Sequence, residues 1–287
     1  MNREAPFQQQ QTATILLPLD GSEAAMAALP IARVIAKVVG AIVHVVHVVP
    51  RPLPRKELLD ALRLRPGQLR GAVIDQLTGP IAATIVQEAV RRQSTFIVMT
   101  VHGRTPSNVL GPIAREVLQQ APCPVILVRP DAAVRPGGPG TVLRRILLPL
   151  DGVPSTTVAS IPAIDLAERG GAELDILLAT TAGVGRPAER GTFVAPRYVD
   201  QPHHEWPAWT QEFINRLCRC LGTCPAVPVH LSLAIGDPAE AILRVAAERR
   251  SDLIALAWRG RLNGKHGAII KTVLHRAPCP VLILRVP

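Results

Sequence analysis

The sequence predicts an α/β protein of two tandem domains, each an open, mostly parallel, Rossmann-like sheet of strand order 3-2-1-4-5. Three observations support this prediction. A set of short motifs occurs twice in the same order, and short apolar runs alternate with segments of helical periodicity. Hydrophobic residues make up 48% of the 287 residues, but aromatic residues make up only 3%. Such aliphatic cores suit buried parallel strands that are covered by helices.

The internal repeat sets the expected domain boundaries. Three motifs occur twice: ILLPLDG from Ile15 and Ile146, a glycine turn from Thr78 and Ile235, and APCPV from Ala121 and Ala277. The offset between the copies therefore grows from 131 to 157 residues after the second strand, which indicates an insertion of about 26 residues. We expect a first domain at 1–131, a linker at 132–143, and a second domain at 144–287 with the insertion within 182–228.

Each copy is expected to read β-α-β-loop/helix-β-α-β-α-β. The predicted strands are 14–19, 41–49, 73–77, 96–100 and 125–128, then 145–150, 174–179, 229–234, 253–257 and 281–285. The predicted helices are 22–40, 80–92 and 111–120, then 155–168, 207–221, 238–249 and 267–276, with an irregular, mobile loop at 183–205. Right-handed crossovers place a ligand site at the carboxyl ends of the strands.

The last strand of each copy is a strongly apolar edge, and such edges invite pairing. Pairing of 125–128 with 281–285 within one chain would make a pseudo-dimer. Domain exchange between two chains, which would give a homodimer, is the alternative.

Composition limits the classes of partner. The longest apolar stretch, 31–49, is interrupted by Arg33 and Lys37, so we expect no membrane span. The N-terminus resembles no signal peptide, which favours a cytoplasmic protein. The net charge of +10 would attract anionic partners, but with one Tyr and four Phe residues and no recognition-helix signature we expect a solvated surface rather than a nucleic-acid site.

The five cysteines fit a reducing compartment. Cys123 and Cys279 occupy the same place in the two copies and are expected to be buried, reduced thiols. Cys218, Cys220 and Cys224 follow two histidines, but their spacing does not match the paired ligand sets of zinc sites. We therefore expect no metal, apart from the Mg²⁺ that accompanies a nucleotide.

Each half resembles a universal stress protein domain from end to end. The resemblance depends on LPLDG after strand one, the turn GDPAE, a Gly-Arg loop after strand four, and APCPV before the last strand. Members that bind ATP share the loop G-x2-G-x9-G-[S/T], whose glycines admit adenosine and whose amides, hydroxyl and helix dipole meet the phosphates.

This loop is degenerate in both halves. In the first, Thr100 replaces the first Gly, seven residues separate Gly103 from Gly111, and Pro112 replaces the Ser or Thr, which removes an N–H and a hydroxyl. In the second, Ala257 replaces the first Gly, and six residues lead from Gly260 to Gly267. Arg104, Arg259, Arg261 and Lys265 could bind phosphates instead, or they could simply form a solvated basic loop.

The other site positions follow from the resemblance. Asp20 and Asp151 stand where members hold the ribose, although an acid there is also a turn-former. The implied nucleotide contacts are Pro18, Asp20, Val48, Thr100, His102, Gly103, Arg104 and Gly111 in the first half, and Pro149, Asp151, Thr180, Ala257, Arg259, Gly260, Arg261 and Gly267 in the second.

Three functions compete on these grounds. We expect a non-enzymatic stress-response or regulatory protein that acts by binding other proteins, because no nucleophile–base pair, Walker loop or Gly-x-Ser-x-Gly elbow is found. The alternative is a switch that binds ATP or AMP with low affinity and at most slow ATP hydrolysis. A related adenine-nucleotide hydrolase would need an activating site that the sequence does not offer.

Overall fold

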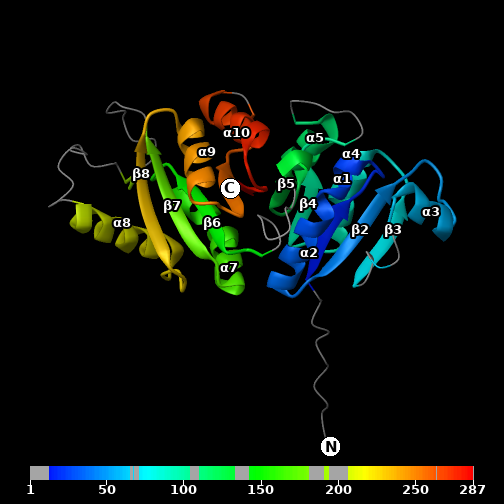
Figure 1. Ribbon diagram of the computed structural model, residues 1–287, viewed down its shortest axis with the longest axis horizontal. Coiled ribbons are helices and arrows are strands. Elements are labelled where there is room, and N and C mark those ends of the chain that lie inside the picture. The colour runs from blue at the N-terminus through cyan, green and yellow to red at the C-terminus, as the bar shows by residue number, and fades with distance from the viewer. Residues whose placement is uncertain are drawn as a thin grey trace, which may run out of the picture.

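The computed structural model describes residues 13–64, 67, 71–103, 110–132, 142–180, 191–193, 206–262 and 264–286. Its strands form one sheet in the order β3-β2-β1-β4-β5-β10-β9-β6-β7-β8 (Figure 1). The strands are β1 (Thr14–Pro18), β2 (Ile42–Val48), β3 (Ala72–Leu77), β4 (Phe96–Thr100), β5 (Val125–Val128), β6 (Arg145–Leu150), β7 (Glu173–Thr180), β8 (Val229–Ile235), β9 (Leu253–Trp258) and β10 (Val281–Arg285). Each half thus has the predicted order 3-2-1-4-5.

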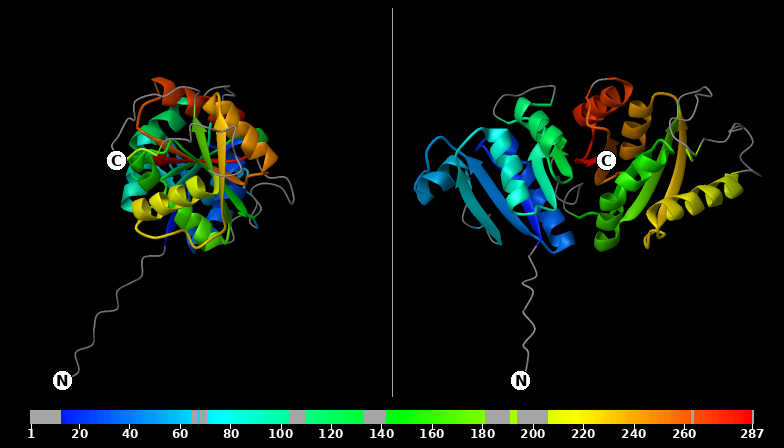
Figure 2. Two further views of the ribbon diagram at one scale, coloured as in Figure 1. Left: turned by 90° about the vertical axis from the view of Figure 1, so that its left-hand side faces the viewer. Right: turned by 180° about the vertical axis from the view of Figure 1, so that it is seen from behind.

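The helices cover both faces of the sheet (Figure 2). They are α1 (Glu23–Met26), α2 (Ala28–Val39), α3 (Arg55–Ala61), α4 (Ile81–Arg91), α5 (Pro112–Gln120), α6 (Pro154–Ala159), α7 (Ile161–Gly170), α8 (Trp206–Leu221), α9 (Pro238–Glu248) and α10 (Gly264–Arg276), with a 3-10 turn at Pro130–Ala132. One core lies under α2, α3, α7 and α8, and the other lies under α4, α5, α9 and α10. Each core is aliphatic and runs through both halves.

The two halves join through their last strands. β5 and β10 pair antiparallel, with Val281 opposite Leu127, Leu282 opposite Ile126 and Ile283 opposite Val125. The other neighbouring strands pair in parallel. The expected pairing of the two apolar edges within one chain is therefore confirmed.

Local signals end and break the helices. The Ser22 hydroxyl caps α1 by accepting from Ala25 N at 3.1 Å, and Gly40, at φ 68°, ends α2. The single helix expected over 22–40 is two helices, because the chain turns at Ala27. The helix expected at 155–168 is likewise divided into α6 and α7 at Ser160, next to Pro162.

Two more expectations concern the second half. The helix expected at 207–221 is present as α8, and its apolar stripe packs into the core through Phe213 and Leu217. The helix expected to begin at Gly267 begins three residues earlier, at Gly264. The linker at 132–143 and the loop at 183–205 lie largely outside the described residues, so the expectations for them stay predictions.

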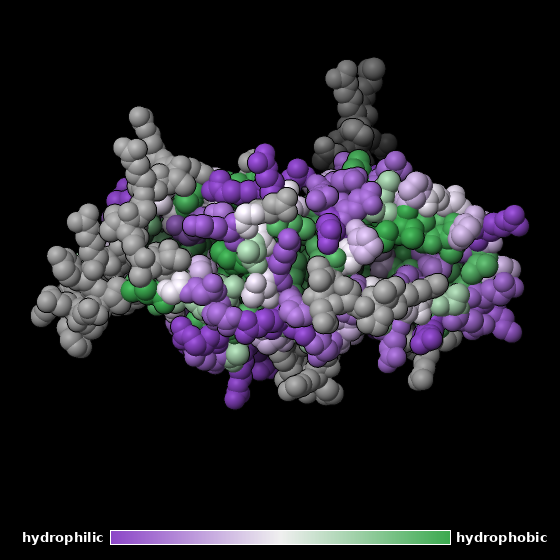
Figure 3. All heavy atoms as spheres, turned by 90° about the horizontal axis from the view of Figure 1, so that it is seen from above, coloured by the Kyte–Doolittle hydropathy of each residue, from purple (hydrophilic) through white to green (hydrophobic). Residues whose placement is uncertain are grey.

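On the face that Figure 3 shows, the described residues are mostly hydrophilic, and groups of hydrophobic side chains are visible among them. The large apolar side chains that are exposed are spread over several elements, as is usual for a protein surface. Among the described residues, no helix combines the length and apolar character needed to cross a membrane.

Candidate functional site

The two aspartates that occur at the same place in both copies of the repeat, Asp20 and Asp151, stabilise the turns that follow β1 and β6. Asp20 Oδ1 accepts hydrogen bonds from Ser22 N at 2.9 Å and from Ser22 Oγ at 2.6 Å. Asp151 Oδ1 accepts from Val153 N at 3.1 Å and from Thr156 Oγ1 at 2.5 Å. Both carboxylates therefore stabilise a turn through hydrogen bonds, as the sequence allowed as the alternative to binding ribose. Asp20 is half-buried, whereas Asp151 is exposed.

Each aspartate is followed by a glycine that a distant segment approaches closely. Gly21 has φ 79° and Gly152 has φ 74°. A Cβ on Gly21 would collide with Ala61 O of α3, and a Cβ on Gly152 would collide with Phe193 O. The segment after the second strand of each half thus packs over the turn that holds the aspartate, a contact that the repeat motifs do not indicate.

In the first half, the loop after β4 offers few donors at the start of α5. Thr100 is buried at the end of β4, and Gly111 N donates to Val101 O at 2.8 Å. Pro112 is the first residue of α5 and has no N–H. Two amide groups that would face a phosphate in an ATP-binding loop are therefore unavailable.

The other predicted residues of the first half lie around the same edge. Gly103 lies close to the Asp20 carboxylate, and a Cβ at this position would require Asp20 Oδ2 to shift. Pro18 and Val48 are half-buried at the ends of β1 and β2. His102 Nδ1 is buried and has no hydrogen-bond partner within the described part of the chain. Arg104 lies outside the described residues.

In the second half, the strand ends surround a pocket of about 140 Å³, roughly ten times the 10–15 Å³ that one water molecule needs. The structure brings four predicted residues to it: Pro149, Asp151, Ala257 and Arg259. The sequence missed the remaining lining residues: Leu150, Thr156, Ala179, Pro238, Ile242, Leu256, His266, Ile269 and Ile270. The pocket thus has an apolar lining with a few polar groups, which is typical of small-molecule sites.

Four predicted residues of the second half do not line this pocket. Gly267 lies inside α10 and lets the helix approach the Leu262 carbonyl, so it does not open the helix as expected. Gly260, at φ 79°, lies in the turn after β9, and Arg261 uses its backbone oxygen to accept from Trp258 Nε1 at 3.2 Å. Thr180 ends β7.

Basic side chains stand near the pocket. Arg259 Nη2 donates to Ser155 Oγ at 3.2 Å, which ties the β9–α10 loop to α6. His266 lies in the first turn of α10, where the helix dipole is positive. Its position beside Lys265 and before the last glycine of the loop was the one signal that could have identified it.

An aromatic cluster anchors residues 191–193 beside this site. Phe193 N donates to Gly152 O at 2.8 Å. The Phe193 ring lies 5.1 Å from that of Trp209 and 5.4 Å from that of Phe213, and the Arg216 guanidinium lies 4.9 Å from its centroid. Helix α8 therefore holds Phe193 against the residue that follows Asp151.

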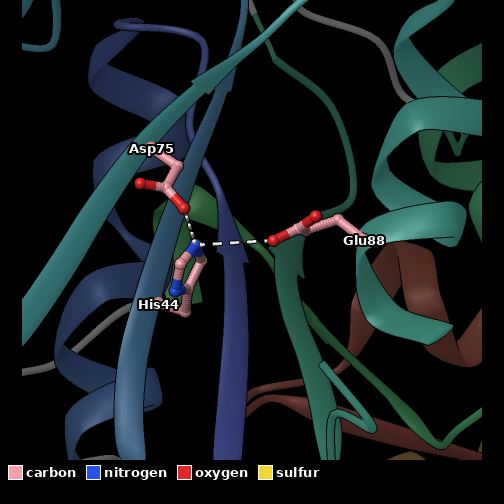
Figure 4. Close-up of side chains that lie close together, drawn as sticks. All are labelled: His44, Asp75 and Glu88. Atoms are coloured by element: carbon pink, nitrogen blue, oxygen red, sulfur yellow. Dashed lines mark ion pairs between the residues drawn. The ribbon is translucent and has the colours of Figure 1, made fainter. Parts of the chain in front are cut away.

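A second group of titratable side chains lies between β2, β3 and α4 in the first half (Figure 4). His44 Nε2 lies 3.1 Å from Asp75 Oδ2 and 3.8 Å from Glu88 Oε1, without the alignment of a hydrogen bond. Arg92 bonds both carboxylates, at 2.7 Å to Asp75 Oδ2 and 2.8 Å to Glu88 Oε1, and Arg91 also bonds Glu88. Because two guanidinium groups occupy these oxygens, the arrangement is a neutralised ion-pair network rather than a set of free metal ligands.

The network shifts two pKa values. The Arg91 hydrogen bond, supported by Arg92, lowers the pKa of Glu88 to about 2 despite its burial. Burial, together with the charge of Arg92, lowers the pKa of His44. The second half fills the corresponding place with Asp175, which accepts from Arg249 Nη2 at 2.9 Å and lies near Arg145.

The cysteines differ from expectation at one place. Burial raises the pKa of the half-buried Cys123 to about 12, and burial also raises the pKa of the buried Cys279, as expected of inert thiols. Cys218 and Cys224 form a disulfide, which the expectation of a reducing compartment did not anticipate. Helix α8 ends at Leu221. Gly222, at φ 79°, then turns the chain back and brings the Cα atoms of Cys218 and Cys224 to 4.5 Å from each other.

The fold is that of a tandem α/β protein, whose two halves share one strand order and join through β5 and β10. The sequence profile of the universal stress protein family matches residues 12–129 and 219–285, and the chain belongs to this family.

Among curated relatives, universal stress protein Rv2005c of Mycobacterium tuberculosis is 26% identical over 207 residues, which cover 70% of this chain and 65% of that protein. Universal stress protein Rv1996 of the same organism is 26% identical over 232 residues, which cover 78% of this chain and 67% of that protein. The chain thus spans about two thirds of the length of these relatives.

Two solved structures share the whole fold. A universal stress protein from Archaeoglobus fulgidus has a TM-score of 0.61 at 18% identity, and the match covers 96% of this chain and 97% of that chain. A protein of unknown function from Pseudomonas aeruginosa has a TM-score of 0.63 at 19% identity, with coverage of 96% and 94%. At this identity the likeness establishes the fold alone.

Proposed function

We propose that this chain is a stress-response or regulatory protein that acts by binding, and that its second half retains a weak adenine-nucleotide site. The observation that carries the proposal is the pocket at the ends of β6, β7 and β9, which Asp151, Arg259 and His266 line together. The carboxylate suits ribose hydroxyls, and the two basic side chains suit phosphates.

The proposed site compensates for a degenerate loop. The loop is three residues shorter than that of ATP-binding members, and Ala268 lacks their terminal hydroxyl, so fewer donors reach the phosphates. Arg259 is held at the pocket by Ser155, and His266 stands at the positive end of α10. Side-chain donors that must be ordered on binding replace preorganised amides, so the affinity is expected to be low.

The two halves are expected to differ in affinity. In the first half the Gly111 N–H is already bonded, Pro112 has none, and Gly103 lies against Asp20. Each missing donor to a charged group costs about 1.5–3 kcal/mol, or roughly 10- to 100-fold in affinity. Nucleotide bound by this chain should therefore lie in the second half.

The test is a thermal-shift and calorimetric titration of the full chain with ATP, AMP and no ligand. A ligand that binds only the folded state raises stability by RT ln(1 + [L]/Kd), or about 2.7 kcal/mol at 100 times Kd. Arg259→Ala should remove most of the shift. Arg244→Ala, which alters an exposed ion pair with Glu248 on α9, is the matched control and should leave the shift intact. Equal shifts in both variants would refute the assignment.

A switch with slow hydrolysis is the second candidate. The observation that favours it is that His266 and Asp151, an acid–base pair in type, line one pocket. Phosphate release that His266→Ala abolishes at ATP concentrations that still saturate the variant would support hydrolysis. Release at the uncatalysed rate would leave binding as the function.

A further inference from the structure

We propose that the Cys218–Cys224 disulfide at the end of α8 is a site of reversible thiol–disulfide exchange with small thiols and dithiols. Cys218 lies in the last turn of α8 and is partly exposed, whereas Cys224 is exposed beyond the helix end. Cys220, an exposed free thiol, lies between them in the sequence. Three cysteines within seven residues are therefore at least partly exposed.

The remaining cysteines make this reactivity selective. The thiolate is the nucleophile in exchange, and access of the reagent to sulfur is required. Cys279 is buried and Cys123 is half-buried, and burial raises the pKa of both thiols, which keeps them in the neutral form. In the folded chain, exchange should be confined to the three cysteines at the end of α8.

The exchange can be written as a balanced reaction. A thiolate RS⁻ attacks the exposed Sγ of Cys224, the S–S bond breaks, and its electron pair goes to Cys218 Sγ, which takes up a proton. The product is a mixed disulfide between R and Cys224. A second thiol attacks the sulfur of R, which releases RSSR and the Cys224 thiol. Two thiols are oxidised, and the protein disulfide is reduced by two electrons.

The surroundings of the disulfide allow reduction in the folded state. Helix α8 is held by Phe213 and Leu217, both buried, and by the contacts of Trp209 with Phe193. The segment after Cys224 is held separately, because Ala226 N donates to Glu168 Oε1 at 2.8 Å. Both sides of the disulfide thus keep their own anchors, so its reduction should release a short surface turn without unfolding the helix.

Figure 1 and Figure 2 place α8 at the outer end of the second half, away from the junction with the first half. A change of redox state there would alter a surface that stays remote from the β5–β10 junction. The aromatic cluster that backs Gly152 connects this surface to the turn that holds Asp151.

The experiment labels the air-oxidised full chain with a maleimide of known mass, before and after native incubation with dithiothreitol or with glutathione. We expect one labelled thiol before reduction and three afterwards, with Cys123 and Cys279 unlabelled until denaturant is added. Oxidised glutathione should restore the single-thiol pattern. Peptide mass spectrometry assigns each label to its cysteine.

Two variants sharpen the test. Cys220→Ser should go from no label to two labels, which shows that exchange does not need Cys220. Cys218→Ala/Cys224→Ala should keep its circular dichroism and carry one label throughout. The proposal is overturned if Cys218 and Cys224 label only in denaturant, if reduction exposes Cys123 and Cys279 as well, or if the oxidised chain already labels at three sites.

Discussion

The substitution Gly152→Ala tests how strongly the insertion is joined to the candidate site. Gly152 has φ 74°, a conformation that costs a non-glycine residue about 1–2 kcal/mol. The added Cβ would also meet Phe193 O well inside the ~3.5–4.0 Å of ordinary carbon contacts. To relieve this clash, Phe193 must move away and lose its hydrogen bond to Gly152 O, which contributes about 0.5–1.5 kcal/mol. The move also weakens the contacts of Phe193 with Trp209 and Phe213, which contribute about 0.5–1.5 kcal/mol each.

Gly171→Ala is the matched control, because Gly171 has φ 61° but open space at the position of a Cβ. Urea unfolding should show a loss of about 1 kcal/mol for Gly171→Ala and about 3 kcal/mol or more for Gly152→Ala. Under the proposed function, only Gly152→Ala should also weaken nucleotide binding, because Asp151 is its neighbour. Equal losses of stability in the two variants would show that Phe193 yields freely and would refute the argument.

Three further predictions concern other parts of the chain. The free energy of unfolding should fall as the pH decreases below about 6.5, because the pKa of His44 is lowered in the folded state and the unfolded chain therefore binds the proton first. It should fall again between pH 4.5 and about 2, because the pKa of Glu88 is lowered in the folded state. In urea unfolding midpoints measured against pH, the upper step should disappear in His44→Gln. Ile126→Ala, which removes a buried side chain opposite Leu282, should cost about 2–5 kcal/mol in the unfolding of the chain, whereas the exposed Val158→Ala should cost under about 0.5 kcal/mol. The double substitution Thr100→Gly and Pro112→Ser should raise the ATP affinity of the first half about 10-fold or more. Calorimetry in an Arg259→Ala background measures this change without the site of the second half. An unchanged affinity would contradict the role given to Pro112.

The sequence predicted what depends on local pattern and on the repeat. The strand order and the pairing of Val125–Val128 with Val281–Arg285 followed from alternation and from two apolar edges that each needed a partner. The break at Ala27 and the early start of α10 at Gly264 were missed, because tertiary packing of short turns decides them. Helix boundaries are the least determined by local sequence.

The candidate site was predicted in part for a similar reason. Asp151, Pro149, Ala257 and Arg259 occupy motif positions, and all four line the pocket. His266 was missed because its helix starts earlier than its glycine suggests. Phe193 and the Cys218–Cys224 disulfide belong to the insertion, whose sequence has no counterpart in the first half, although Ala61 O approaches Gly21 there as Phe193 O approaches Gly152.

The junction of β5 with β10 has a consequence for the synthesis of the chain. Val125–Val128 are made long before Val281–Arg285, so the growing polypeptide carries an unpaired, wholly apolar strand edge until Val281–Arg285 are made. Two neighbouring ribosomes on one message would then present the same edge to each other, and an antiparallel match between two β5 strands would compete with the native one. The native β5–β10 pairing removes this edge only once the second half is complete.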